Sequence, residues 1–230
     1  MAAVAENEAM DLALRPGAVG ALRARLLRTL AGDQPFTIVS NNCWGAHVYQ
    51  ALDIPYATPF VGLFIPPESY LTLLGDFSRL MRASLEFTPA SRSASVNAWR
   101  EAEGLRYPIG VLGGEVEIDF QHYPDEAAAG EAWRRRSARV VSDPRRLFFK
   151  FDDREGASAA QIDAFCALGL SNKVCFTAKT GAGPAVVVPP APGEDHAPDG
   201  VSLAAISRRY FNTLRWISTL PRWAPLPSLI

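Results

Sequence analysis

The segment 40–47, with sequence SNNCWGAH, contains the residue types best suited to covalent chemistry. Cys43 follows a predicted strand and precedes a predicted helix, where backbone amide dipoles are expected to lower a thiol pKa and to favour the nucleophilic thiolate. His47 lies four residues further on, so on a helix it shares a face with Cys43 and is a candidate base. A structural role in the core is the alternative for both side chains, since cysteine is among the most buried residue types.

A second histidine, His122, closes a predicted strand over 115–123 in which apolar and acidic residues alternate. His122 falls on the apolar face, so the default expectation is a buried core histidine. Its position at the end of the strand would also let it face a cleft and act as the base for Cys43. The acidic face is predicted to be solvated, and it carries Glu115, Glu117 and Asp119.

Charged pairs provide two further candidate sites. Arg136 and Arg139 are three residues apart on a predicted helix, where they can point together and offer paired donors to a phosphate or carboxylate, or form a solvated helix end. Asp152-Asp153 resembles the acidic element that holds a metal-bound nucleotide sugar in some glycosyltransferases, although a turn or helix cap is the commoner role. A zinc site at Cys43 is not expected, because the other histidines and cysteines lack paired ligand spacing.

The whole chain has the composition of an ordinary globular protein: 230 residues, 48% hydrophobic, with a net charge of −1. This balance provides no global field to attract nucleic acid, so no nucleic-acid partner is expected. The three cysteines lack the pattern of a disulfide framework, which favours a reducing compartment. No secretory signal and no run of about 18 apolar residues is present, so the sequence predicts a soluble, cytoplasmic protein.

Strands and helices alternate along the sequence. This order predicts an α/β three-layer domain with a mixed, largely parallel sheet flanked by helices. In such sheets binding groups gather where strands end and helices begin, which is the position of the segment 40–47. The predicted strands are 36–40, 60–65, 109–112, 115–123, 147–151, 173–178 and 186–188; the predicted helices are 20–31, 45–52, 70–81, 125–140, 157–168 and 203–217.

We divide the chain into three parts. Residues 1–32 form an amphipathic helical lead-in, 33–200 a single α/β domain, and 201–230 a basic aromatic helix with a proline-containing tail. Arginines between aromatic residues in 203–230 allow peripheral contact with a membrane surface, and packing against the domain is the alternative.

Six short blocks occur in a fixed order between about Phe36 and Thr177. Together they resemble a bacterial domain family of unknown function, whose members are often described as exopolysaccharide or capsule biosynthesis proteins and sometimes as acetyltransferases. The resemblance implies surface-polysaccharide assembly and, less directly, group transfer. Ala46 departs from the family pattern, which usually has a second glycine after Trp-Gly. The blocks are SNNCWG at 40–45, VGLFI at 61–65, Tyr107-Pro108-x-Gly110, His122-Tyr123, Trp133-x-x-Arg136-x-x-Arg139 and NKVxFT at 172–177.

The leading hypothesis is an enzyme that transfers or removes a group on a sugar or polysaccharide intermediate, with Cys43 as nucleophile and His47 or His122 as base. No cofactor is specified by the sequence. One alternative is a glycosyltransferase-like enzyme that uses Asp152 or Asp153 with a divalent cation. Another is a non-catalytic assembly partner held at the inner face of the membrane by 203–230. The residues expected to contact substrate are Asn41, Asn42, Trp44, Tyr123, Arg136, Arg139, Asp152, Asp153 and Lys173.

Overall fold

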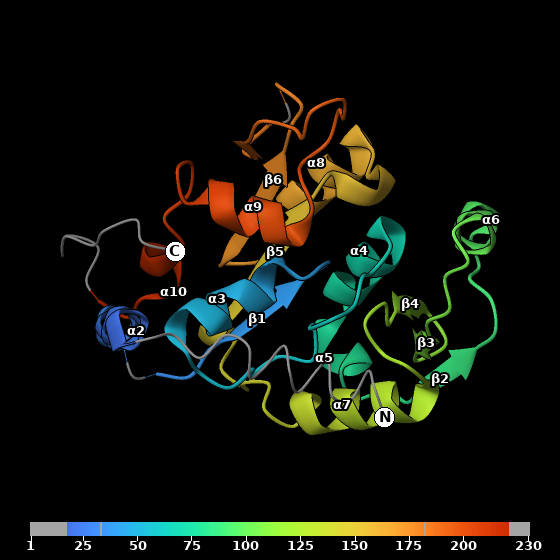
Figure 1. Ribbon diagram of the computed structural model, residues 1–230, viewed down its shortest axis with the longest axis horizontal. Coiled ribbons are helices and arrows are strands. Elements are labelled where there is room, and N and C mark those ends of the chain that lie inside the picture. Colours follow the sequence, from blue (N-terminus) through green and yellow to red (C-terminus); the bar gives the residue numbers. More distant parts are fainter. Residues whose placement is uncertain (1–17, 33, 182, 221–230) are drawn as a thin grey trace.

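The computed structural model describes residues 18–32, 34–181 and 183–220, and two sheets organise this part of the chain (Figure 1). The first sheet has the order β1-β5-β6-β7 and all its pairs are parallel. The second has the order β2-β3-β4 and is antiparallel. The strands are β1 (Thr37–Ser40), β2 (Leu85–Thr88), β3 (Ile109–Leu112), β4 (Val116–Asp119), β5 (Leu147–Asp152), β6 (Lys173–Thr177) and β7 (Val186–Val187).

Helices cover both faces of the parallel sheet, which confirms the predicted three-layer α/β architecture. The α-helices of the described part are α2 (Ala18–Ala31), α3 (Trp44–Leu52), α4 (Pro67–Gly75), α5 (Phe77–Leu80), α6 (Ala94–Ala102), α7 (Glu126–Ser137), α8 (Ala159–Ala167), α9 (Gly200–Ser207) and α10 (Thr213–Ile217). Two short 3₁₀ helices, η1 (Pro144–Arg146) and η2 (Arg154–Gly156), flank β5.

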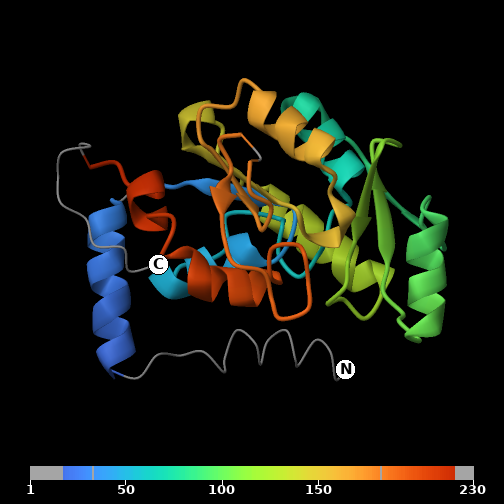
Figure 2. The same cartoon turned by 90° about the horizontal axis from the view of Figure 1, so that it is seen from above.

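Successive side chains of β5 point to opposite faces of the parallel sheet and so enter two different cores. Phe148 packs with α2, α3, α9 and α10 on one face, whereas Phe149 and Phe151 pack with α4, α8 and the antiparallel sheet on the other. A strand buried on both faces is apolar at successive positions, which explains the largely apolar run that predicted β5. Figure 2 shows α2 and α6 at opposite ends of the molecule with the sheets between them.

The two ends of the described chain belong to the core. Leu27 of α2, Leu203 of α9 and Leu214 of α10 are all fully buried in the same cluster. The single helix predicted over 203–217 is two helices, because Asn212 caps a new helix at α10 by accepting a hydrogen bond from the Arg215 amide. In the described part of the chain, no helix has the length and apolar character needed to cross a bilayer.

The predicted strand over 60–65 is wrong. Only Phe64 pairs, in an isolated bridge with Asp119, and Gly62 has a φ of +71° that interrupts an extended conformation. The predicted strand over 115–123 ends early, at Asp119. Its acidic face is not solvated as predicted, because Glu117 and Asp119 are buried beneath neighbouring segments. Glu117 accepts hydrogen bonds from the Ser91 hydroxyl and the Arg92 amide.

The weakly patterned stretch 84–106, which precedes the predicted strand 109–112, contains β2 and α6, and neither element was predicted from the sequence. The helix predicted over 70–81 is divided at Asp76, whose φ of −144° and ψ of 56° lie outside the helical region. α6 is a nine-residue helix with few large apolar side chains, and none of its residues is buried.

Candidate functional site

The carboxyl ends of β1 and β5 bring the polar residues of two distant segments together. The strands are parallel neighbours, with Ser40 opposite Lys150. Asn41 and Asn42 follow the end of β1, and Asp152 ends β5. Because parallel strands end at the same edge of a sheet, these side chains meet there, as expected for an α/β binding site.

A closed network of buried polar groups forms at this edge. The Lys150 ammonium donates to Asp152, to Asn42 Oδ1 at 2.8 Å and to Asn41 Oδ1 at 3.2 Å. The two asparagine amides donate in turn to the Asp152 carboxylate, at 2.9 Å from Asn41 and 2.8 Å from Asn42. We call these four residues the Lys150 network. Burial lowers the pKa of Lys150, and the adjacent Asp152 carboxylate opposes that shift.

Cys43 is half-buried beside this network, as the N-cap residue of α3. Hydrogen bonds from the Gly62 and Leu63 backbone and the positive charge of Lys150 lower its pKa, but burial has the larger effect. The net result is a raised thiol pKa, so the lowered pKa expected from the amide dipoles alone is wrong. The thiol nevertheless faces donors and a cation that would stabilise negative charge developing on the sulfur or on a bound group.

The loop 61–65 that faces Cys43 is fixed on two sides. The Ile65 amide donates to the Asn41 carbonyl oxygen at 2.9 Å. On the other side, the His122 amide donates to the Gly62 carbonyl at 3.1 Å and the Tyr123 hydroxyl donates to the Val61 carbonyl at 2.8 Å. The turn after β4 therefore positions the backbone amides that contact the thiol.

His122 lies at this turn and is exposed, so the expectation of a core histidine is wrong. The reason is that β4 ends at Asp119, and the strand alternation does not continue to His122. A Cβ atom built on Gly62 would lie 3.4 Å from His122 Cβ, which places the histidine directly beside the loop that contacts Cys43.

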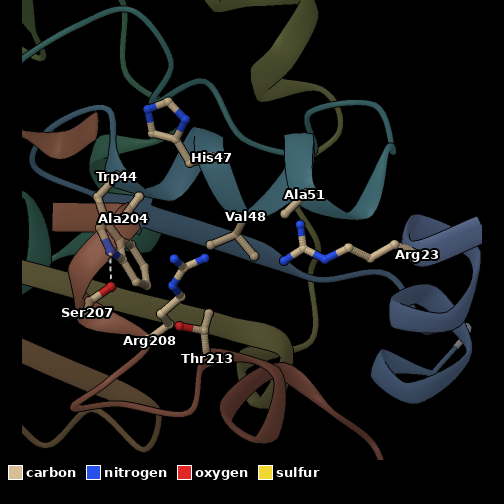
Figure 3. A pocket seen from close by; sticks show the side chains of 9 residues that line it. All are labelled: Arg23, Trp44, His47, Val48, Ala51, Ala204, Ser207, Arg208 and Thr213. Atoms are coloured by element: carbon tan, nitrogen blue, oxygen red, sulfur yellow. Dashed lines mark hydrogen bonds between the residues drawn. The ribbon is translucent and has the colours of Figure 1, made fainter. Parts of the chain in front are cut away.

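His47 is half-buried on α3, and burial lowers its pKa. It shares a cavity with Trp44 and Ser207, seen in Figure 3. Gln50 and Asp199 are the groups that counteract the lowered pKa of His47, and Cys43 is not among the causes of the shift. His47, which was predicted from its spacing to share a helix face with Cys43, thus lines this cavity.

Arg136 and Tyr123 act together in positioning the loop. The Arg136 guanidinium is buried and donates to the Tyr123 hydroxyl and, at 3.4 Å, to the Val61 carbonyl, and it lies 5.3 Å from the centre of the Tyr56 ring. Arg139 is exposed and donates to the Tyr56 carbonyl at 3.3 Å. The two arginines thus bind protein groups in this structure, and Arg136 supports the loop that faces Cys43.

Two other predicted contact residues also have internal partners. Trp44 is buried, and its indole donates to the Ser207 hydroxyl at 3.1 Å. Asp153 is buried and accepts from the Thr177 hydroxyl at 2.7 Å and from the backbone amides of Ala178 and Ala197 at 3.0 and 2.6 Å. In the described part of the chain, no group of three or more His, Cys, Asp or Glu residues is arranged to hold a metal ion.

Lys173 does not belong to the site. It begins β6, at the opposite end of the strand from the carboxyl edge, and its ammonium donates to the carbonyl oxygens of Cys166 and Leu168 at the end of α8. A lysine near a helix carboxyl terminus stabilises the unpaired carbonyl groups there. Lys173 is thus a helix-capping residue that lies away from the site, where the sequence had predicted a contact with substrate.

The family described as "Domain of unknown function (DUF1919)" matches residues 22–192. The chain belongs to this family. A protein of Haemophilus influenzae named "Uncharacterized protein" is 33% identical over 155 residues, which are 67% of this chain and 68% of that relative. The DUF1919 match includes Cys43, the loop 61–65 and the Lys150 network, and it ends before α9.

Lys150, the loop amides and Gly200 were not among the site residues predicted from the sequence of this DUF1919 chain. Lys150 interrupts the apolar run of β5, and a lysine within a buried strand is a detectable signal. Gly200 begins α9 against the backbone of Cys43 and Trp44, where a Cβ atom would lie 2.7 Å from the Trp44 nitrogen. No local pattern could reveal that contact, because it joins segments more than 150 residues apart.

Proposed function

We propose that this protein is a sugar-modifying acyl transferase or hydrolase of surface-polysaccharide biosynthesis, with Cys43 as its nucleophile. The observation that carries the proposal is the position of the half-buried thiol at the carboxyl edge of the parallel sheet, facing the Gly62 and Leu63 backbone and the Lys150 charge. The polysaccharide context is supported by the order of the sequence blocks between Phe36 and Thr177.

The proposed first step is acyl transfer to the sulfur. A base removes the thiol proton, the thiolate attacks the carbonyl carbon of an acyl donor, and a C–S bond forms while the bond to the donor's leaving group breaks. The leaving group departs with the proton. The Gly62 and Leu63 backbone amides are the candidate donors to the tetrahedral oxyanion.

In the second step a sugar hydroxyl, or water in a hydrolase, attacks the thioester carbon. A C–O bond forms, the C–S bond breaks, and the proton of the attacking hydroxyl is taken up by the base while the thiolate is released. Of the two predicted bases, His122 is the better candidate because it lies beside Gly62 and is exposed to an incoming substrate. The Lys150 network supports the edge, and the Lys150 ammonium within it lowers the pKa of Cys43.

The glycosyltransferase alternative has less support than the Cys43 proposal. Asp152 faces the Lys150 ammonium and two amides, and Asp153 accepts three protein hydrogen bonds. Neither carboxylate is arranged as one of a pair of ligands open to a divalent cation. The membrane-associated assembly partner is distinguished from the enzyme by the test below.

The test is covalent trapping on the folded protein. We expect an acyl thioester and an activated aryl ester to leave one acyl group on the Cys43 peptide, detected by mass spectrometry and removed by hydroxylamine. Cys43→Ala should abolish this adduct, whereas Cys166→Ala, which changes the other half-buried cysteine, should retain it. His122→Gln should slow acylation and change its pH profile.

The same variants decide the biological context. Cells that carry Cys43→Ala should produce surface polysaccharide with altered acylation, and cells with Cys166→Ala should not. If no donor acylates Cys43 and the polymer is unchanged in Cys43→Ala cells, the enzyme proposal is wrong. Acylation of Cys43 with an unchanged polymer would refute the polysaccharide context alone.

A further inference from the structure

A cavity of about 180 Å³ lies among four helices, α2, α3, α9 and α10 (Figure 3). It is separate from the thiol of Cys43, which is not one of its lining residues. The lining residues are Arg23, Trp44, His47, Val48, Ala51, Ala204, Ser207, Arg208 and Thr213.

Positive charge converges on this cavity from two helices. Arg23 extends from α2 and Arg208 from the end of α9, and Figure 3 shows their guanidinium groups on either side of the Val48 side chain. The described residues that line the cavity include no aspartate or glutamate. Both arginines have other interactions in the chain. A guanidinium carries five N–H donors, and an anion bound here would share them with these interactions.

Neutral donors complete the lining. The Ser207 hydroxyl accepts from the Trp44 indole at 3.1 Å, so its own proton can be donated to another acceptor. Thr213 supplies a second hydroxyl, which Figure 3 shows beside the Arg208 side chain. Both residues are only 1% exposed, and their positions are therefore fixed by the surrounding helices.

The size of the cavity limits its ligand. At about 30 Å³ of liquid volume per water molecule, the cavity has room for roughly six waters. This is below the roughly 300–1,000 Å³ typical of sites for drug-sized molecules. A phosphate group fits, together with the first atoms of the carbon skeleton that carries it, whereas a nucleotide does not.

We propose that this cavity binds the phosphate group of a small phosphate monoester. Arg23 and Arg208 neutralise its two negative charges through charge-assisted hydrogen bonds, and the hydroxyls of Ser207 and Thr213 donate to or accept from the remaining oxygens. His47 also lines the cavity, and Figure 3 shows its imidazole pointing away from the two guanidinium groups. This binding does not depend on the chemistry proposed for Cys43.

The experiment is calorimetric titration of the full chain with inorganic phosphate and with a hexose 1-phosphate, at constant ionic strength set with chloride. We expect saturable binding of both, with the hexose 1-phosphate at least as tight as inorganic phosphate. Arg23→Gln and Arg208→Gln should each weaken binding by at least about tenfold, because each removes a charge-assisted contact.

Each variant has a matched control on the same helix or at its end. Arg25→Gln and Arg209→Gln remove exposed arginines that do not line the cavity, and they should leave affinity unchanged. Cys43→Ala should also bind normally, which separates this proposal from the enzyme proposal. The phosphate site is refuted if the titration shows no saturable phosphate binding in the chloride buffer. It is also refuted if the control variants weaken phosphate binding as much as Arg23→Gln and Arg208→Gln. If inorganic phosphate binds and the hexose 1-phosphate does not, the proposal that the ligand is a phosphate monoester is wrong.

Discussion

At the residue scale, the thiol of Cys43 experiences opposing influences on its pKa. Burial and the Asp199 carboxylate raise the pKa, while the Gly62 and Leu63 backbone and the Lys150 ammonium lower it. Burial dominates, so the thiol is protonated at neutral pH in the resting protein. In the reaction that we propose, the thiol proton must therefore be removed by a base, the role that we propose for His122.

We predict that alkylation of Cys43 by iodoacetamide accelerates only as the pH rises past the ordinary thiol pKa of 9.0. Asp199→Asn should shift this profile to lower pH, because it removes a negative charge near the sulfur while asparagine still caps α9. Peptide-resolved mass spectrometry of the folded protein measures the rates. Rapid alkylation at pH 7 would contradict the raised pKa.

Lys150 and Asp152 form a fully buried ion pair. We predict that Lys150→Met destabilises the protein by about 3–5 kcal/mol, because it leaves the Asp152 carboxylate buried without its cation. The double variant Lys150→Met, Asp152→Leu should lose much less, since it removes both charges. Urea unfolding measures both free energies, and Lys179→Met is the control at an exposed lysine. Equal losses in the single and double variants would show that the charge pair does not determine the cost.

At the scale of elements, α9 is placed by its first residue. Gly200 packs against the backbone of Cys43 and Trp44, and Asp199 caps the helix by accepting from the Val201 and Ser202 amides. The close approach of two backbones brings the charge of Asp199 near the thiol and places Ser207 against the Trp44 indole. One glycine thus couples α9 to both the Cys43 edge and the proposed phosphate cavity.

Two glycine substitutions should have effects of opposite sign. Gly200→Ala is expected to destabilise the protein by about 1–3 kcal/mol, because the new Cβ would lie 2.7 Å from the Trp44 nitrogen. Gly130→Ala, inside α7, meets only an ordinary 3.5 Å contact with Phe87 and should stabilise by about 0.5–1 kcal/mol through helix propensity. Chemical denaturation measures both. A neutral Gly200→Ala would mean that α9 can move away from α3 at little cost.

At the scale of the whole molecule, the two sheets share one core. Phe149 and Phe151 of the parallel sheet belong to the same buried cluster as Val116 and Ile118 of the antiparallel sheet. The bridge between Phe64 and Asp119 also ties the antiparallel sheet to the loop that faces Cys43. The separation into two sheets therefore does not divide the described chain into two folding units.

Hydrogen exchange should reveal this shared core. We predict that the most protected amides of β4 and β5 exchange with the same free energy, which equals that of global unfolding. The amides of α6 should exchange at a much lower free energy, because this helix buries no side chain. Exchange under increasing denaturant, followed by NMR, makes the comparison. Earlier opening of β4 than of β5 would show that the antiparallel sheet unfolds independently.

Most of the parallel sheet could be predicted from local patterns. The apolar runs of β1, β5 and β6 are typical of strands buried on both faces, and the helices between them follow from helical periodicity. The loop 61–65 has an equally apolar sequence but contains Gly62 at positive φ, so its burial is that of a loop under neighbouring elements. Apolar character by itself does not distinguish these cases.

The sequence by itself determined the α/β class and the strand-to-helix position of Cys43, because both follow from local patterning. The meeting of Asn41 and Asn42 with Asp152 required the pairing of β1 with β5, which the tertiary structure decided. Only the tertiary structure decided how the charges pair, which amides face the thiol, and that His47 and Arg208 share a cavity. The physical reason is that these contacts join residues far apart in the chain. The pKa values and roles of these residues depend on burial and on neighbouring charges, which local sequence spacing does not encode.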